Sequence, residues 1–170
     1  MLFTPFRKFA TILVIALLVI PVARAGAVNL TMGEKAPGFS LKDIDGNQVT
    51  LEQFRGKTVV IAFWSTWCSR CEEELTFLQD TLGERTDVAV LLVNQDSERK
   101  VSLDRVRAIR ERLGIRFQVL LDEGLSLWEV YGVDALPTSV VIGKDGALKL
   151  IEPSFYWGSP EHLLAAIGQN

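Results

Sequence analysis

The only two cysteines of this 170-residue chain, Cys68 and Cys71, stand two residues apart. They follow an apolar, β-branched run at 58–63 and precede a segment, 70–82, in which leucines recur at helical spacing. This order predicts a strand, a tight turn and a helix, with Cys68 just before or at the helix start. Unpaired backbone N–H groups and the positive end of the helix dipole stabilise a thiolate there. Cys71, about one turn further on, could reach the same sulfur and close a small disulfide.

Two other kinds of site share this cysteine spacing, a zinc site and a structural disulfide. Zinc in proteins normally takes four ligands, whereas this chain has no further cysteine and a single histidine, His162, far away in sequence. A structural bridge that closes so short a loop removes little entropy from the unfolded chain. A cysteine pair with aromatic flanks between a strand and a helix therefore favours redox chemistry.

Residues 1–25 have the pattern of an export signal. Two basic residues, Arg7 and Lys8, precede a nearly unbroken apolar run at 10–22, and a small-x-small triplet closes the segment. The alternative is an uncleaved membrane anchor, because the apolar run is only somewhat shorter than a membrane span. Either way, we expect one domain at 26–170 in a periplasmic or other extracytoplasmic compartment, where cysteine pairs oxidise.

Composition and charge are ordinary for a globular protein. The chain is 48% hydrophobic and 23% charged, with 18 basic residues against 21 acidic ones. A leader of 25 residues would remove three basic residues and no acidic one, which leaves 15 against 21. A mildly acidic domain is a poor candidate for nucleic-acid binding, so we expect no nucleic-acid partner.

Apolar patterns and turn signals predict an α/β sandwich with a mixed sheet. Asp-Gly pairs at 45–46 and 145–146 lie between short apolar runs and predict two antiparallel hairpins. We expect strands at 39–41, 48–51, 59–63, 88–93, 117–121, 139–142 and 147–151. We expect helices at 51–54, 70–82, 97–113, 125–131 and 160–167. Ser159 is the expected cap of the last helix.

Two motifs together resemble the thioredoxin fold. The first runs from Trp64 to Cys71, and the second is the Ala-Leu-Pro-Thr segment 135–138, just before an apolar strand. The entry segment 33–39, the first hairpin and an extra central helix are similar to the exported TlpA/ResA/CcmG-type branch of that superfamily. The resemblance covers about 28–168. It implies a thioredoxin-like sandwich whose mixed central sheet carries an N-terminal hairpin extension and an inserted helix.

The resemblance also implies roles for the two cysteines. Cys68 would be the attacking thiolate and Cys71 the resolving thiol that releases the mixed disulfide. Elementary chemistry agrees, because only the sulfur at the helix start is both exposed and electrostatically favoured. We expect no metal and no cofactor beyond a redox-active Cys68–Cys71 disulfide.

A substrate groove is expected beside the cysteines. Pro137 would be a cis-proline opposite them, where a residue without an N–H leaves neighbouring backbone groups free to pair with an extended peptide. Leu136 and Thr138 would border this groove, and Trp67 would flank it beside the nucleophile. The other aromatic residues of interest are interpreted as packing: Trp64, Trp128, Phe155, Tyr156 and Trp157.

Glu74, three residues after Cys71, stands where this branch carries a carboxylate close to the active site. It could shuttle a proton to or from Cys71 if partial burial raises its pKa toward neutrality. The alternative is that Glu72, Glu73 and Glu74 are all first-turn acids that complement the helix dipole. The buried Asp of ordinary thioredoxins maps to Ala62 here, which favours the catalytic interpretation of Glu74 and argues against a housekeeping thioredoxin.

The two residues between the cysteines, Ser69 and Arg70, are the expected tuning residues. Most relatives have Pro where this chain has Arg70, and Ala135 replaces a family-typical Gly. A guanidinium beside Cys71 should stabilise the thiolate and raise the reduction potential, whereas the neighbouring glutamates act in the opposite sense. Each 30 mV corresponds to about 1.4 kcal/mol, and the sequence leaves the sign of the sum open.

The leading hypothesis is an exported thiol:disulfide oxidoreductase that reduces protein disulfides. Expected substrates are the cysteine pair of apocytochrome c, as in cytochrome c biogenesis, or the thiols of a metallo-site. A membrane thiol-electron transporter would supply the electrons, and we expect a monomer. The alternatives are a dithiol oxidant that donates its disulfide, a peroxidase, and a non-enzymatic Cu(I)-delivery module that uses both sulfurs as ligands.

Overall fold

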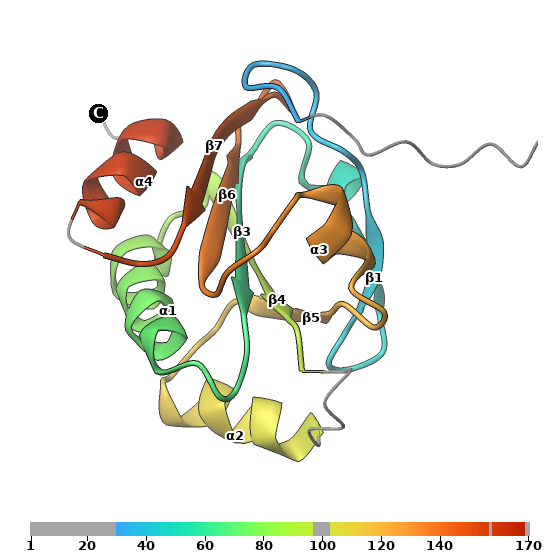
Figure 1. The fold of residues 1–170 in the computed structure, drawn as a ribbon, viewed down its shortest axis with the longest axis vertical. Coiled ribbons are helices and arrows are strands. Elements are labelled where there is room, and N and C mark those ends of the chain that lie inside the picture. Colours follow the sequence, from blue (N-terminus) through green and yellow to red (C-terminus); the bar gives the residue numbers. More distant parts are fainter. Residues whose placement is uncertain (1–29, 97–102, 157, 169–170) are drawn as a thin grey trace, which may run out of the picture.

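A computed structural model describes residues 30–96, 103–156 and 158–168 (Figure 1). The predicted leader at 1–25 lies outside these residues, as do the start of the predicted helix at 97–113 and Trp157. Across the described ranges, no helix combines the length and apolar character that crossing a membrane requires.

Seven strands form one mixed sheet in the order β2-β1-β5-β4-β3-β6-β7. Their bounds are β1 Ser40–Asp43, β2 Gln48–Thr50, β3 Thr58–Trp64, β4 Val88–Asn94, β5 Gln118–Leu121, β6 Thr138–Ile142 and β7 Leu148–Pro153. β3 pairs in parallel with β4 and antiparallel with β6. Every predicted strand forms, with bounds that differ by at most two residues, and the predicted fold class is confirmed.

Helices cover both faces of the sheet. They are the 3-10 turn η1 Leu51–Phe54 and the α-helices α1 Ser69–Leu82, α2 Leu103–Arg112, α3 Ser126–Val130 and α4 Ser159–Ile167. Figure 1 shows α1 and α4 on one side of the sheet and α3 on the other. Buried side chains of α1, α2 and α4 share one apolar core, and those of α3 belong to a second core across the sheet.

The side chains of β3 belong alternately to two cores, which explains why the chain forms this sandwich. Every residue of β3 is buried. Val60 and Ala62 belong to the core beneath α1 and α4, whereas Ile61 and Phe63 belong to the core beneath α3. A strand whose side chains are apolar on both faces is stable only between two covering layers. β3 therefore lies at the centre of the protein.

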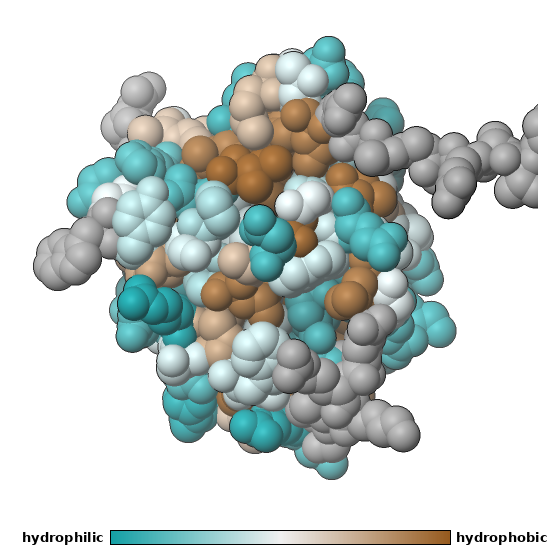
Figure 2. Space-filling model, viewed as in Figure 1, coloured by the Kyte–Doolittle hydropathy of each residue, from teal (hydrophilic) through white to brown (hydrophobic). Residues whose placement is uncertain are grey.

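The surface mixes polar and apolar residues. Figure 2 shows hydrophobic and hydrophilic residues interspersed over the face in view. In the described part of the chain, three large apolar side chains are strongly exposed, namely those of Met32, Trp67 and Tyr156. Tyr156, one of the aromatic residues interpreted as packing, thus lies at the surface, and the predicted exposure of Trp67 is confirmed.

The first hairpin extends one edge of the sheet, as predicted, because β1 also pairs with β5. One local prediction needs correction. Ser159 does not cap α4, since Gly158 is the cap residue with φ of 100°. A left-handed φ suits glycine, which has no Cβ to clash. The hydroxyl of Ser159 is buried and bonds Glu152 and the Ser154 carbonyl instead.

A buried carboxylate, Asp122, holds the start of α3. Its two oxygens accept hydrogen bonds from the backbone N–H groups of Leu127, at 3.0 Å, and Trp128, at 2.9 Å. The Ser126 hydroxyl and the Gln95 amide donate to the same carboxylate. The first N–H groups of a helix have no partner within the helix, so Asp122 satisfies donors that would otherwise be buried and unpaired.

We expect Asp122→Ala to lower the free energy of unfolding by about 2 kcal/mol, because it removes a helix cap and leaves buried donors unpaired. Urea unfolding followed by circular dichroism measures this loss. Glu123→Ala is the matched control, since Glu123 is exposed and its truncation should change the value by less than about 0.5 kcal/mol. Equal losses in both variants would contradict the assigned role of Asp122.

Candidate active site

The two cysteines lie where β3 passes into α1, as predicted. Cys68 is the N-cap residue of α1, and its sulfur accepts a hydrogen bond from the backbone N–H of Cys71 at 3.2 Å. The two residues are joined by a disulfide, with their Cα atoms 5.3 Å apart. Cys68 is partly exposed, whereas Cys71 is completely buried. Of the two sulfurs, only that of Cys68 can therefore attack another molecule or be attacked by one.

Buried polar groups anchor the turn that carries Cys68. The backbone N–H of Thr66 donates to Asp96 Oδ2 at 2.8 Å, and the side-chain amide of Asn94 donates to the same oxygen at 3.0 Å. Asn94 is the last residue of β4, the parallel neighbour of β3, and Asp96 follows two residues later. Two adjacent parallel strands thus fix the loop before α1, and a fixed loop preorganises the sulfur against the helix N–H groups.

Pro137 lies next to this turn because of sheet pairing. Thr138, the first residue of β6, pairs with Phe63 at the end of β3. The Leu136–Pro137 peptide bond is cis, as predicted. The Pro137 carbonyl accepts a hydrogen bond from the Ser154 N–H at 2.7 Å. Within the described residues, the backbone N–H and carbonyl of Leu136 have no hydrogen-bond partner, so both remain available to an incoming peptide.

A cavity of about 410 Å³ opens beside the active-site turn. It is lined by Trp67, Gln95, Leu125, Trp128, Asp134, Ala135 and Leu136. Trp67 and Leu136 were predicted to border a groove, whereas Pro137 and Thr138 are buried and do not line this cavity. Trp128 does pack, with its ring 6.5 Å from that of Phe63, but it also forms part of the cavity wall. No local sequence pattern around Gln95, Trp128 or Asp134 predicts that these residues line the cavity.

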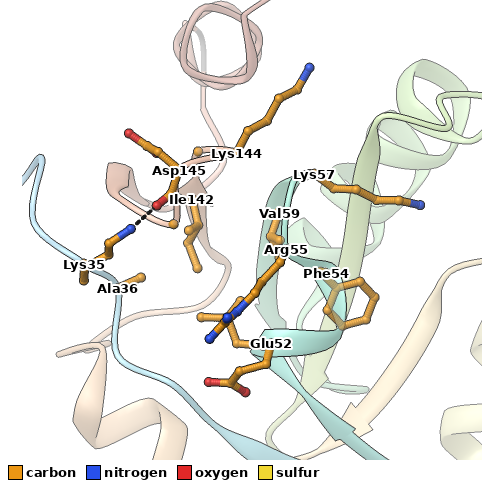
Figure 3. A pocket seen from close by; sticks show the side chains of 13 residues that line it. Lys35, Ala36, Glu52, Phe54, Arg55, Lys57, Val59, Ile142, Lys144 and Asp145 are labelled. Carbon is orange, nitrogen blue, oxygen red and sulfur yellow. Dashed lines mark hydrogen bonds between the residues drawn. The ribbon is translucent and has the colours of Figure 1, made fainter.

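A second cavity, also of about 410 Å³, lies at the opposite end of β3 (Figure 3). It includes Val59, at the start of the strand, whereas the cysteines follow the strand's end. Its rim carries charges of both signs, and the Lys35 ammonium donates to the Asp145 carbonyl. Figure 3 shows the side chains of Lys57 and Lys144 extending away from it. These two cations therefore do not converge on a common point inside the cavity.

Glu74 differs from the two glutamates that precede it. It is 2% exposed, and its Oε1 accepts a hydrogen bond from the Ser139 hydroxyl at 2.9 Å. Its Oε2 is buried without a partner among the described residues. Glu72 pairs with Arg112 at 2.7 Å, and Glu73 is exposed. The structure thus singles out Glu74 as the glutamate that points into the protein.

Burial raises the pKa of Glu74 to about 7. The hydrogen bond from Ser139 acts in the opposite direction, and the negative charge of Glu152 raises the pKa further. Glu74 lies one helical turn after Cys71 on α1, and both side chains are buried against the sheet. Ser139 pairs with Ala62 across β3 and β6, so the carboxyl group reaches the sheet beside the small side chain at position 62.

Ser69 and Arg70 both lie on the surface. Ser69 is the first residue of α1. The guanidinium of Arg70 donates to the Phe155 carbonyl at 3.1 Å, which ties it to the segment before α4. Within the described ranges, no group of three or more His, Cys, Asp or Glu side chains could hold a metal ion.

Comparison with known proteins agrees with this geometry. The family model described as the AhpC/TSA family matches residues 32–151. The chain belongs to the AhpC/TSA family. ResA, a thiol-disulfide oxidoreductase of Bacillus thuringiensis strain Al Hakam, is 32% identical over 124 residues, which cover 73% of this chain and 69% of the relative. ResA of Geobacillus thermodenitrificans is 34% identical over 124 residues, with 72% and 69% covered.

Solved structures place this AhpC/TSA protein among thioredoxin-like folds. The structure of a Chlorobium tepidum protein described as thiol:disulfide interchange protein DsbE matches with a TM-score of 0.71 and 26% identity. The match covers 82% of this chain and 99% of that protein. The predicted resemblance to the ResA/CcmG-type branch is therefore confirmed, and the protein is a thiol-disulfide oxidoreductase.

The raised pKa of Glu74 should make the folded disulfide form less stable as pH rises. Below about pH 4.5 the group is protonated in both states and has no effect. Between pH 4.5 and about 7 only the unfolded chain loses the proton, and above pH 7 the folded protein must hold a buried charge. The accumulated loss is about 3 kcal/mol.

Glu74→Gln removes this charge while keeping the side-chain shape. We expect its free energy of unfolding to exceed that of the wild type by a margin that grows from pH 4.5 to 7 and then stays constant. Urea unfolding of the oxidised protein across this pH range measures the margin. Glu73→Gln, at an exposed position, should differ from the wild type in free energy of unfolding by the same amount at every pH. A gain for Glu74→Gln that is equal at every pH would refute the burial argument.

Proposed function

We propose that this oxidoreductase is exported and reduces disulfides in other proteins, with Cys68 as the nucleophile and Cys71 as the resolving thiol. One observation carries the proposal. The partly exposed sulfur of Cys68 stands at a helix N-terminus, and its partner, Cys71, is buried one turn before a carboxyl group whose pKa is about 7. This arrangement separates the tasks of attacking a substrate and of moving a proton.

The chemistry balances as a two-electron exchange. The Cys68 thiolate attacks one sulfur of a substrate disulfide, so that the substrate S–S bond breaks, a mixed disulfide forms and one substrate thiolate leaves. Cys71 then passes its proton to Glu74 and attacks the Cys68 sulfur, which releases the second substrate thiolate. The substrate is reduced to a dithiol, and the enzyme is left with the Cys68–Cys71 disulfide.

The surroundings of Cys68 support an extended peptide as substrate. The unpaired backbone groups of Leu136 lie beside Pro137, where a peptide could add main-chain hydrogen bonds. The adjoining cavity offers the tryptophan rings at 67 and 128 to an apolar side chain, and Asp134 offers a negative charge. Thr138, whose hydroxyl donates to the Ala135 carbonyl at 2.8 Å, would hold the loop in shape.

The leader-like segment 1–25 supports export, and the protein would act in the periplasm or another extracytoplasmic space. Candidate substrates are the cysteine pair of apocytochrome c and the thiols of a metallo-site. Because that compartment oxidises thiols, the dithiol would be restored by a membrane thiol-electron transporter. Ser69 and Arg70 would adjust the reduction potential from their positions between the cysteines.

The roles of the two cysteines can be separated by substitution. We expect Cys68→Ser to abolish reduction of an insulin disulfide, because no thiolate remains at the helix start. Cys71→Ser should instead accumulate a mixed disulfide between Cys68 and its substrate, because nothing resolves it. Non-reducing electrophoresis and mass spectrometry of the trapped species from the native host measure this difference. Retained reductase activity in Cys68→Ser would overturn the nucleophile assignment.

The direction of the reaction is tested by the reduction potential of the Cys68–Cys71 pair. A reductant should have a potential near that of thioredoxin, roughly −270 mV, whereas a strong oxidant lies near −120 mV. Equilibration with glutathione buffers, read by the alkylation state of Cys68, gives this value. A potential near −120 mV would reverse the proposed direction of the reaction and make the protein a disulfide donor.

A further inference from the structure

A second buried carboxylate lies beside Glu74. Glu152 on β7 is 7% exposed and is paired directly with Ser139 of β6. Residues opposite each other in an antiparallel pair project from the same face of the sheet. The Ser139 hydroxyl is the group that donates to Glu74, so the two carboxylates approach the same face from a helix and a strand. Residues 74 and 152 lie far apart in the chain, and no local pattern indicates that they are neighbours.

Glu152 is connected to solvent by His162 of α4. Its Oε2 lies 3.3 Å from His162 Nδ1, and the His162 side chain is 55% exposed. Its Oε1 accepts a hydrogen bond from the buried Ser159 hydroxyl at 3.4 Å. His162 is the only histidine of the chain, and imidazole is the side chain that exchanges protons with water in the range around neutrality.

The groups that face these carboxylates are few. On α1, the buried Cys71 lies one turn before Glu74, and Arg70 is directed to the Phe155 carbonyl. From the segment before α4, the Tyr156 hydroxyl donates to Glu152, which raises the pKa of that tyrosine. Among the described residues, His162 is the only group capable of positive charge that pairs with either carboxylate.

We propose that Glu152 and His162 are positioning residues that control when Glu74 holds its proton and thereby set the pH dependence of disulfide exchange at Cys71. The inference rests on the proposed role of Glu74. While His162 is protonated, its charge offsets that of Glu152, and Glu74 can ionise more readily. When His162 is neutral, the uncompensated charge of Glu152 opposes a second negative charge nearby. Glu74 therefore keeps its proton to higher pH.

Substitutions of Glu152 and of His162 should shift the titration midpoint of Glu74 in opposite directions. Glu152→Gln removes a negative charge and should lower the titration midpoint of Glu74. His162→Gln removes the compensating charge and should raise the midpoint by a smaller amount. In the double variant, the His162 substitution should have no further effect, because no charge remains for it to compensate.

The measurement is the carboxyl ¹³C titration of Glu74 in the disulfide form, followed by NMR for the full chain. The pH profile of the Cys71-dependent exchange step should move in the same direction as the midpoint in each variant. Glu161→Gln is the matched control, because Glu161 is an exposed acid next to His162 and its loss should leave the midpoint unchanged.

Shifts of the same sign in Glu152→Gln and His162→Gln would overturn the inference, because a general loosening of the fold moves both variants alike. Shifts no larger than that of the Glu161→Gln control would overturn it as well. Neither result touches the proposed function, which fails if Cys68→Ser retains activity, if Cys71→Ser traps nothing, or if the reduction potential lies near −120 mV.

Discussion

The structure depends on one junction, the point where the central strand β3 ends and α1 begins. Because β3 is buried on both faces, the layers on either side hold its end in place. Asp96 at the end of the neighbouring parallel strand fixes the turn, and the turn delivers Cys68 to the cap position of α1. A sulfur at that position faces backbone N–H groups that no helical carbonyl can satisfy. The same geometry explains why Cys68 is partly exposed and Cys71 is buried.

The buried carboxyl group of Glu74 lowers the stability of the fold when it is ionised. A carboxyl group that is buried with one oxygen bonded to Ser139, and with the other unpartnered among the described residues, is destabilising when charged. The proton-transfer role proposed for Glu74 would account for such a group, because a buried acid with a pKa of about 7 can give and take a proton near neutral pH. The nearby Glu152 increases this tendency, because two close negative charges oppose each other.

The spacing of residue types along short stretches of the sequence predicted some parts of the candidate site and not others. The strand, turn and helix around Cys68 follow from apolar spacing within residues 58–82, and the structure confirms them. Glu74 could be ranked above Glu72 and Glu73 only through resemblance to a family, because all three occupy the first turns of the same helix. Packing separates them physically, since only Glu74 faces the sheet. Ser159 was assigned to a helix cap because its local sequence is typical of one, yet a tertiary contact with β7 uses its hydroxyl.

By itself, the sequence determined the order of the elements, the two hairpins and the placement of a cysteine at a helix start, because these depend on residues close together in the chain. Only the tertiary structure decided that Trp128 shares a cavity with Trp67 and that Glu152 lies beside Glu74. The pairing of β6 with β3 brings Ser139, and with it Glu152, to the face of the sheet that faces Glu74. The register between β3 and β6, which are distant in the chain, is chosen by the whole core rather than by any local pattern. Trp128 reaches the cavity because α3 packs on the sheet against Phe63.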